Sequence, residues 1–99
     1  MSYRDSLKQS FEAYMRVFYQ EHGRFDFNDF VDFAVTLLNY NINAQIISAQ
    51  DKREAAYYLT TLYNRGMGNR ITEADLQRIT DMIVTDYALD MQILQRILG

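Results

Sequence analysis

No proline occurs anywhere in the 99 residues of this chain. An average chain of this length would contain about five prolines. Because a proline in a helix interior costs about 3 kcal/mol, its absence favours long, uninterrupted helices. Apolar residues make up 48% of the chain and charged residues 23%, which is the balance of a globular protein rather than a disordered one. We therefore expect a single helical domain over residues 1–99.

Apolar side chains recur at helical spacing in the first half of the chain. They predict a first helix over residues 3–21, with Gly23 just past its end. Its apolar stripe comprises Leu7, Phe11, Tyr14, Met15 and Phe18. A second helix is expected from Asp26, as N-cap with Asp29 three residues later, to about Tyr40. That segment is apolar nearly all round, which indicates the central helix of the core.

The second half of the chain repeats this pattern of stripes and caps. A third helix is expected within residues 44–65, with Ser48 as N-cap. The two glycines of NRGMG (64–68) stand where a left-handed C-cap is wanted. Thr72, with an acid three residues later and apolar residues on both sides, is the best start signal of the chain. If unbroken, the helix over residues 73–98 spans about 39 Å.

These elements predict an all-α fold, a single-domain four-helix bundle-like arrangement with a long C-terminal helix. The final stretch, DYALDMQILQRILG, carries apolar residues on two faces of a helix, more than the other helices can cover. We therefore expect it to be a surface for self-association or for a protein partner. The residues predicted to bind protein are Tyr87, Leu89, Met91, Ile93 and Ile97.

Two stretches, GRFDFNDF and NRGMGNRITEAD, are similar in spacing to EF-hand loops. The resemblance covers about a quarter of the chain and implies paired helix-loop-helix units around calcium. An EF-hand ligates calcium through oxygens at six fixed loop positions. Here the first position of one loop is Phe18, and the second loop places Gly66 and Gly68 at ligand positions. Helix capping accounts for the same residues, so we expect no calcium, and a degenerate EF-hand-like pair stays an alternative.

Catalytic and metal-binding chemistry has few candidate residues in this sequence. The chain has no cysteine, which excludes disulfides, thiolate ligands and thiol nucleophiles, and its single histidine is His22. No motif places a nucleophile or an orienting carboxylate beside that histidine. RGMGNR lacks the spacing of a phosphate loop. We therefore expect a protein that is not an enzyme and has no cofactor and no metal site.

The charge of the chain says little about its partners. Ten Lys/Arg against thirteen Asp/Glu give a net charge of −3, with both signs interleaved. A nucleic-acid-binding protein usually shows a basic excess. We therefore expect no nucleic acid, although Arg65, Arg70 and Arg78 leave a small nucleic-acid-binding regulator as an alternative. No apolar run approaches the ~18 residues of a membrane span, and the N-terminal sequence has no signal-peptide core, so we expect a cytoplasmic location and no membrane contact.

Aromatic residues are the remaining functional signal. The chain contains eight tyrosines and six phenylalanines. Tyr57 and Tyr58 are adjacent and cannot share one face of a helix, and Tyr19 falls off the main stripe of the first helix. Exposed tyrosine is typical of binding surfaces. The sequence thus favours a small protein-binding or regulatory protein of the adaptor, chaperone, immunity or inhibitor type, forming a homodimer or higher oligomer.

Overall fold

The computed structural model describes residues 3–40 and 48–85. Over these residues the fold is all-α, as the sequence predicts, and contains no strand. Its elements are α1 (Tyr3–His22), α2 (Phe27–Val35), the π-helical turn η1 (Thr36–Tyr40), α3 (Ala49–Gly66) and α4 (Glu73–Thr85). The sequence predicts that the fourth helix continues to residue 98 as a long C-terminal helix. The part of this prediction beyond Thr85 lies outside the described residues.

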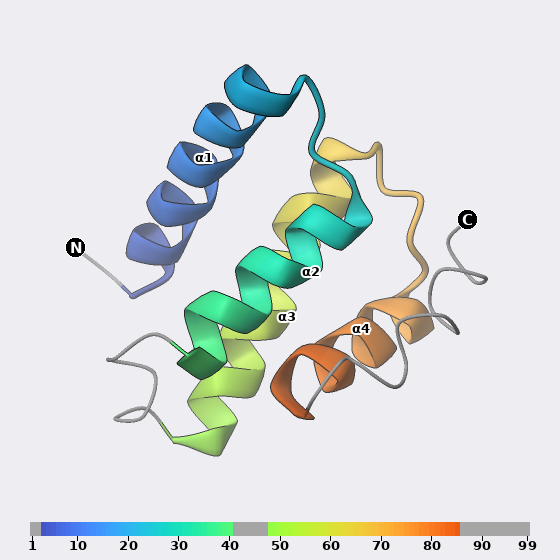
Figure 1. The fold of residues 1–99 in the computed structure, drawn as a ribbon. Helices are drawn as coiled ribbons and strands as arrows, with labels where there is room; N and C mark the ends of the chain where they lie inside the picture. Colours follow the sequence, from blue (N-terminus) through green and yellow to red (C-terminus); the bar gives the residue numbers. More distant parts are fainter. Residues whose placement is uncertain (1–2, 41–47, 86–99) are drawn as a thin grey trace.

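Helix α3 is the element that the others share. It contacts α1, α2 and α4, and α2 also contacts α4. Figure 1 shows α2 lying across α3, with α1 on one side of this pair and α4 on the other. None of the described helices offers an apolar stretch that would cross a bilayer.

Helix α2 provides the centre of the core. Phe30, Val31 and Ala34 are completely buried. They pack with buried side chains of α3 and α4, among them Leu59, Ile79 and other aliphatic residues of the same cluster. The predicted second helix thus contributes completely buried side chains to the core, whereas α3 is the helix that contacts each of the other three. The predicted helix to Tyr40 continues with a change of geometry, because its last five residues form the π-helical turn.

The start of α2 is fixed by the predicted capping box. The Asp26 carboxylate accepts a hydrogen bond from the Asp29 amide at 3.1 Å, and the Asp29 carboxylate accepts one from the Asp26 amide at 3.0 Å. Partial burial opposes ionisation of Asp26. The amide of Asp29 and the Arg24 guanidinium, 2.7 Å away, outweigh it and hold the pKa of Asp26 below its ordinary value. Both carboxylates are thus committed to the turn that begins α2.

The connection between α3 and α4 depends on one buried amide side chain. Asn64 Oδ1 accepts a hydrogen bond from the Ile71 amide at 2.9 Å, and Asn64 Nδ2 donates to the Ile71 carbonyl at 3.3 Å. Gly68 and Asn69 adopt positive φ between these residues. Of the two glycines predicted to cap α3, Gly68 therefore takes the left-handed conformation, whereas Gly66 is the last helical residue.

The other predicted caps are present. The hydroxyl of Ser48 accepts from the Asp51 amide at 3.1 Å, and the hydroxyl of Thr72 accepts from the Asp75 amide at 3.3 Å. Gly23 follows α1 with φ of 73°. The predicted caps at the starts of α2, α3 and α4 and the predicted glycine after α1 are thus in place.

Replacement of Asn64 tests the connection. Asn64→Leu leaves the buried Ile71 amide and carbonyl without partners, so we expect the free energy of unfolding to fall by about 2 kcal/mol. Urea denaturation followed by circular dichroism measures this. Gln50→Leu, an exposed change on the same helix, is the control and should stay within about 0.5 kcal/mol of the wild type. Equal effects of the two substitutions would contradict the role assigned to Asn64.

Candidate functional site

The C-terminal half of α1 is the part of the described fold with the most uncovered apolar surface. From Arg4 to His22, only Leu7 and Phe11 are buried. Beyond Phe11 the large apolar side chains of α1 are half-buried or exposed. The exposed fractions are 40% for Tyr14, 37% for Met15, 52% for Val17 and 59% for Tyr19. Of the predicted apolar stripe, Leu7 and Phe11 are therefore buried, whereas Tyr14 and Met15 keep more than a third of their surface exposed.

The aromatic contacts of α1 explain this exposure. The centroid of the Phe11 ring lies 6.0 Å from that of Phe25, and 5.8 Å from those of both Phe30 and Phe33. Tyr14 packs on Phe33 at 4.6 Å. These contacts use one edge of the helix. At 100° per residue, Met15 and Tyr19 turn progressively away from that edge on one side and Val17 turns away on the other.

An apolar pocket lies beside this exposed surface. It has a volume of about 220 Å³ and lies between α1, the α1–α2 turn and the C-terminal end of α3. We call it the α1–α3 groove. Its apolar lining residues are Phe11, Met15, Phe25, Leu62, Tyr63 and Met67.

A second, shallow depression adjoins the groove on the outside of α1. It is formed by Glu12, Met15, Arg16, Tyr19 and Gln20, and we call these residues the outer flank of α1. Because Glu12 and Met15 line both hollows, the two form one continuous surface. That surface combines apolar side chains with one acid and one base.

Tyr63 is the aromatic residue of α3 that lines the groove. Its ring stacks on Phe30 with centroids 4.6 Å apart and planes 13° apart. Burial raises the pKa of Tyr63 to about 12, and the negative charges of Asp26 and Asp29 add to the rise. The phenol therefore stays neutral throughout the physiological range. It supplies this surface with a polar group and no charge.

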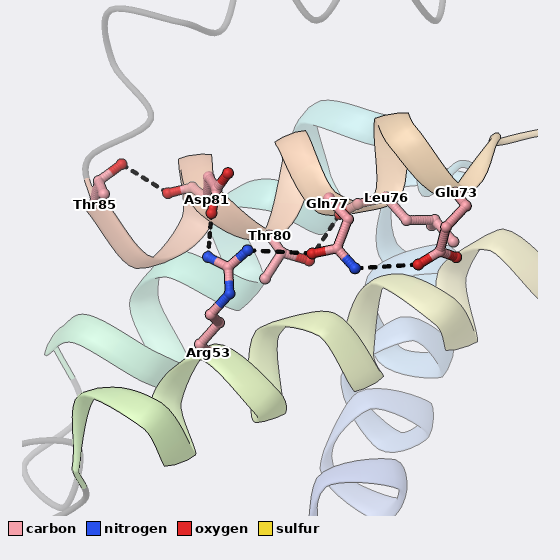
Figure 2. Close-up of polar contacts among 7 residues, drawn as sticks. All are labelled: Arg53, Glu73, Leu76, Gln77, Thr80, Asp81 and Thr85. Atoms are coloured by element: carbon pink, nitrogen blue, oxygen red, sulfur yellow. Dashed lines mark hydrogen bonds and ion pairs between the residues drawn. The ribbon is translucent and has the colours of Figure 1, made fainter.

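The polar side chains between α3 and α4 are satisfied by one another. In Figure 2, Arg53 of α3 reaches across to Asp81 and Gln77 of α4. Gln77 donates to Glu73 at 3.1 Å, and the hydroxyl of Tyr57 donates to Glu73 at 2.8 Å. This bond, with some desolvation and the Glu73 charge, raises the pKa of Tyr57. The cluster joins two helices and leaves no open donor set for a ligand.

The remaining residues considered from the sequence are dispersed. His22 is exposed beside Phe18, with ring centroids 4.2 Å apart. Arg65, Arg70 and Arg78 are exposed, and Arg78 lies 3.9 Å from the carboxylate of Asp75. Among residues 3–40 and 48–85, no group of three His, Asp or Glu side chains is arranged to hold a metal ion.

The predicted protein-binding residues, Tyr87, Leu89, Met91, Ile93 and Ile97, lie outside the described residues, and the prediction stays open. The exposed surface on α1 was not predicted, because Tyr14 and Met15 belong to the apolar stripe of the first helix. The signal that could have found it is the width of the apolar arc, since Val17 and Tyr19 extend it beyond what one neighbour covers. No protein-family model, curated protein or solved structure matches this chain.

The environment of Tyr63 predicts a loss of stability at high pH. A pKa raised from 10 to about 12 by folding means that the unfolded chain releases this proton first. The stabilisation is complete below pH 10 and is lost as the pH rises towards 12. Between about pH 9 and about pH 11.5 the wild type should lose about 2 kcal/mol more than Tyr63→Phe, which has no titrating group there.

Urea denaturation of the wild type and Tyr63→Phe at both pH values isolates this effect from the other tyrosines and lysines, which the two proteins share. Equal losses of stability in both proteins would show that the phenol of Tyr63 is not shifted.

Proposed function

We propose that this chain is a small protein-binding module that acts without catalysis, through the outer flank of α1 and the α1–α3 groove. The observation that carries the proposal is the exposure of Met15 and Tyr19 on the side of α1 that adjoins an apolar pocket. Contiguous exposed apolar surface on a globular protein marks interaction sites, because leaving it in water is unfavourable.

The dimensions of the groove favour a protein partner over a small molecule. Pockets that hold drug-sized ligands or cofactors measure about 300–1,000 Å³, whereas this one measures about 220 Å³. That volume suits one or two side chains inserted from a partner. Its polar groups are few, with Glu12 at the edge and the neutral phenol of Tyr63 in the lining. A hydrophobic anchor side chain therefore fits this groove better than a charged metabolite does.

The shape of the surface favours recognition of a helix. An exposed helix with a groove along one side is the arrangement by which amphipathic partner helices dock their apolar face. Tyr19 and Met15 would supply contact area, tyrosine at a low cost in conformational entropy and methionine by adapting its shape. Glu12 and Arg16 would form a charged rim, which contributes more to orientation than to affinity.

The C-terminal residues Tyr87, Leu89, Met91, Ile93 and Ile97 stay a second proposed contact surface, on the basis of their two-faced apolar pattern. A module with two such surfaces would suit an adaptor, chaperone, immunity protein or inhibitor, working as a homodimer or larger oligomer. We place this activity in the cytoplasm as part of the same proposal.

Photocrosslinking at the outer flank tests the proposed function. The photoreactive residue p-benzoylphenylalanine in place of Tyr19 should form a discrete crosslinked product in an extract of the source cells. The same residue in place of Glu54, on the exposed polar side of α3, is the matched control and should not. Met15→Lys added to the Tyr19 variant should suppress the product, because it places a charge at the centre of the contact.

Mass spectrometry of the product identifies the partner as another protein or a second copy of this chain. Products of equal yield from both positions, or none from position 19, would contradict a binding surface on α1.

A further inference from the structure

We propose that the partner on the outer flank of α1 is a second copy of this chain, bound with the two α1 helices antiparallel about a two-fold axis near Met15. The inference rests on the proposed function, since it names the occupant of the same surface. Homo-oligomers most often associate by such two-fold contacts, in which one patch must be complementary to itself. The outer flank meets this requirement in its charges and in its apolar side chains.

The charges of the outer flank are complementary to themselves when the helix is reversed. Glu12 and Arg16 line the outer flank one helical turn apart, in a row beside Met15. In an antiparallel pair, Glu12 of each copy faces Arg16 of the other, so the two-fold axis produces the ion pair twice. Both side chains are exposed, and neither takes part in an ion pair within the described part of the chain. They are therefore available to a partner.

The apolar side chains fit the same register. Met15 lies near the axis and meets Met15 of the partner copy. Tyr19, the most exposed of the large apolar side chains at 59%, then lies level with Gln9 of the partner copy, about 4.5 Å along the helix from Glu12 at the edge of the partner's α1–α3 groove. Its ring can enter that groove beside Leu62, and its hydroxyl can donate to the Glu12 carboxylate. One arrangement thus uses the groove, the exposed tyrosine and both charges.

The chain's own C-terminal segment is a less suitable occupant of this surface. Arg53 pairs with Asp81 and Tyr57 with Glu73, so α4 runs antiparallel to α3. Thr85 therefore lies towards the N-terminal end of α3, whereas the groove is lined by the C-terminal end. The last described residue of α4 therefore lies at the opposite end of α3 from the groove. A second copy reaches the outer flank directly.

The limited area of one helix flank sets the expected strength. Stable interfaces bury about 800 Å² on each partner, and smaller ones are weak or transient. We therefore expect a dimer that is seen by sedimentation equilibrium at protein concentrations on the order of 100 μM and dissociates on dilution. Added salt should weaken it, because its ion pairs are exposed.

Charge exchange between Glu12 and Arg16 tests the register. Glu12→Arg alone presents two bases, and Arg16→Glu alone presents two acids, so each variant should self-associate roughly tenfold more weakly than the wild type. Mixed in equal amounts, the two variants should form a heterodimer, because every base of one then faces an acid of the other. The double variant Glu12→Arg with Arg16→Glu should regain self-association. Circular dichroism of each variant verifies that α1 remains helical.

Each result decides the proposal. Weakened single variants, a heterodimer from their mixture and recovery in the double variant support it. A wild type that stays monomeric at the highest concentration overturns it, and a Tyr19 crosslink to a different protein would then leave the proposed function standing. A dimer that ignores these charges but is lost in Leu89→Asp with Ile93→Asp also overturns it, in favour of association through the C-terminal segment.

Discussion

The burial of Phe11 is the contact on which the placement of α1 depends. Its ring joins those of Phe25, in the α1–α2 turn, and Phe30 and Phe33, in α2, so one side chain ties the first helix to the centre of the core. Leu7 is the other buried side chain of α1 between Arg4 and His22. Both buried side chains thus lie in the first half of this 20-residue helix, whereas in its second half Tyr14 and Phe18 pack on Phe25 along one edge and leave Met15, Val17 and Tyr19 exposed. The proposed binding surface is a consequence of this unequal attachment.

The helix starts could be predicted from the sequence because capping is local. Asp26, Ser48 and Thr72 each accept a hydrogen bond from an amide three residues ahead, so the signal and its effect lie within one turn of chain. The exposure of Met15 could not be predicted in this way, because it depends on how far α3 extends beside α1. Which of the two glycines at the end of α3 adopts the left-handed conformation could not be predicted from local sequence either. That Gly68 takes the positive φ depends on where the buried hydrogen bonds anchor the loop.

The hydrogen bonding of polar side chains distinguishes the contact between α3 and α4 from the proposed binding surface on α1. Among the described residues, no buried side-chain nitrogen or oxygen lacks a hydrogen-bond partner. Asn64 closes the loop before α4, and Arg53 and Glu73 join α4 to α3. The polar side chains between α3 and α4 therefore have hydrogen-bond partners within the chain and need no ligand. The outer flank of α1 differs, since its acid, its base and its apolar side chains all face solvent together.

A two-fold contact through α1 also constrains the size of any assembly. An isologous interface uses the same patch on both copies, so the outer flank is consumed when two chains have paired and the assembly closes as a dimer. Growth beyond two chains then requires a different surface. The sequence predicts such a surface in residues 86–99, from their apolar pattern. A closed dimer would therefore assign self-association to α1 and leave residues 86–99 for another protein. Larger oligomers would require both surfaces to bind copies of the same chain.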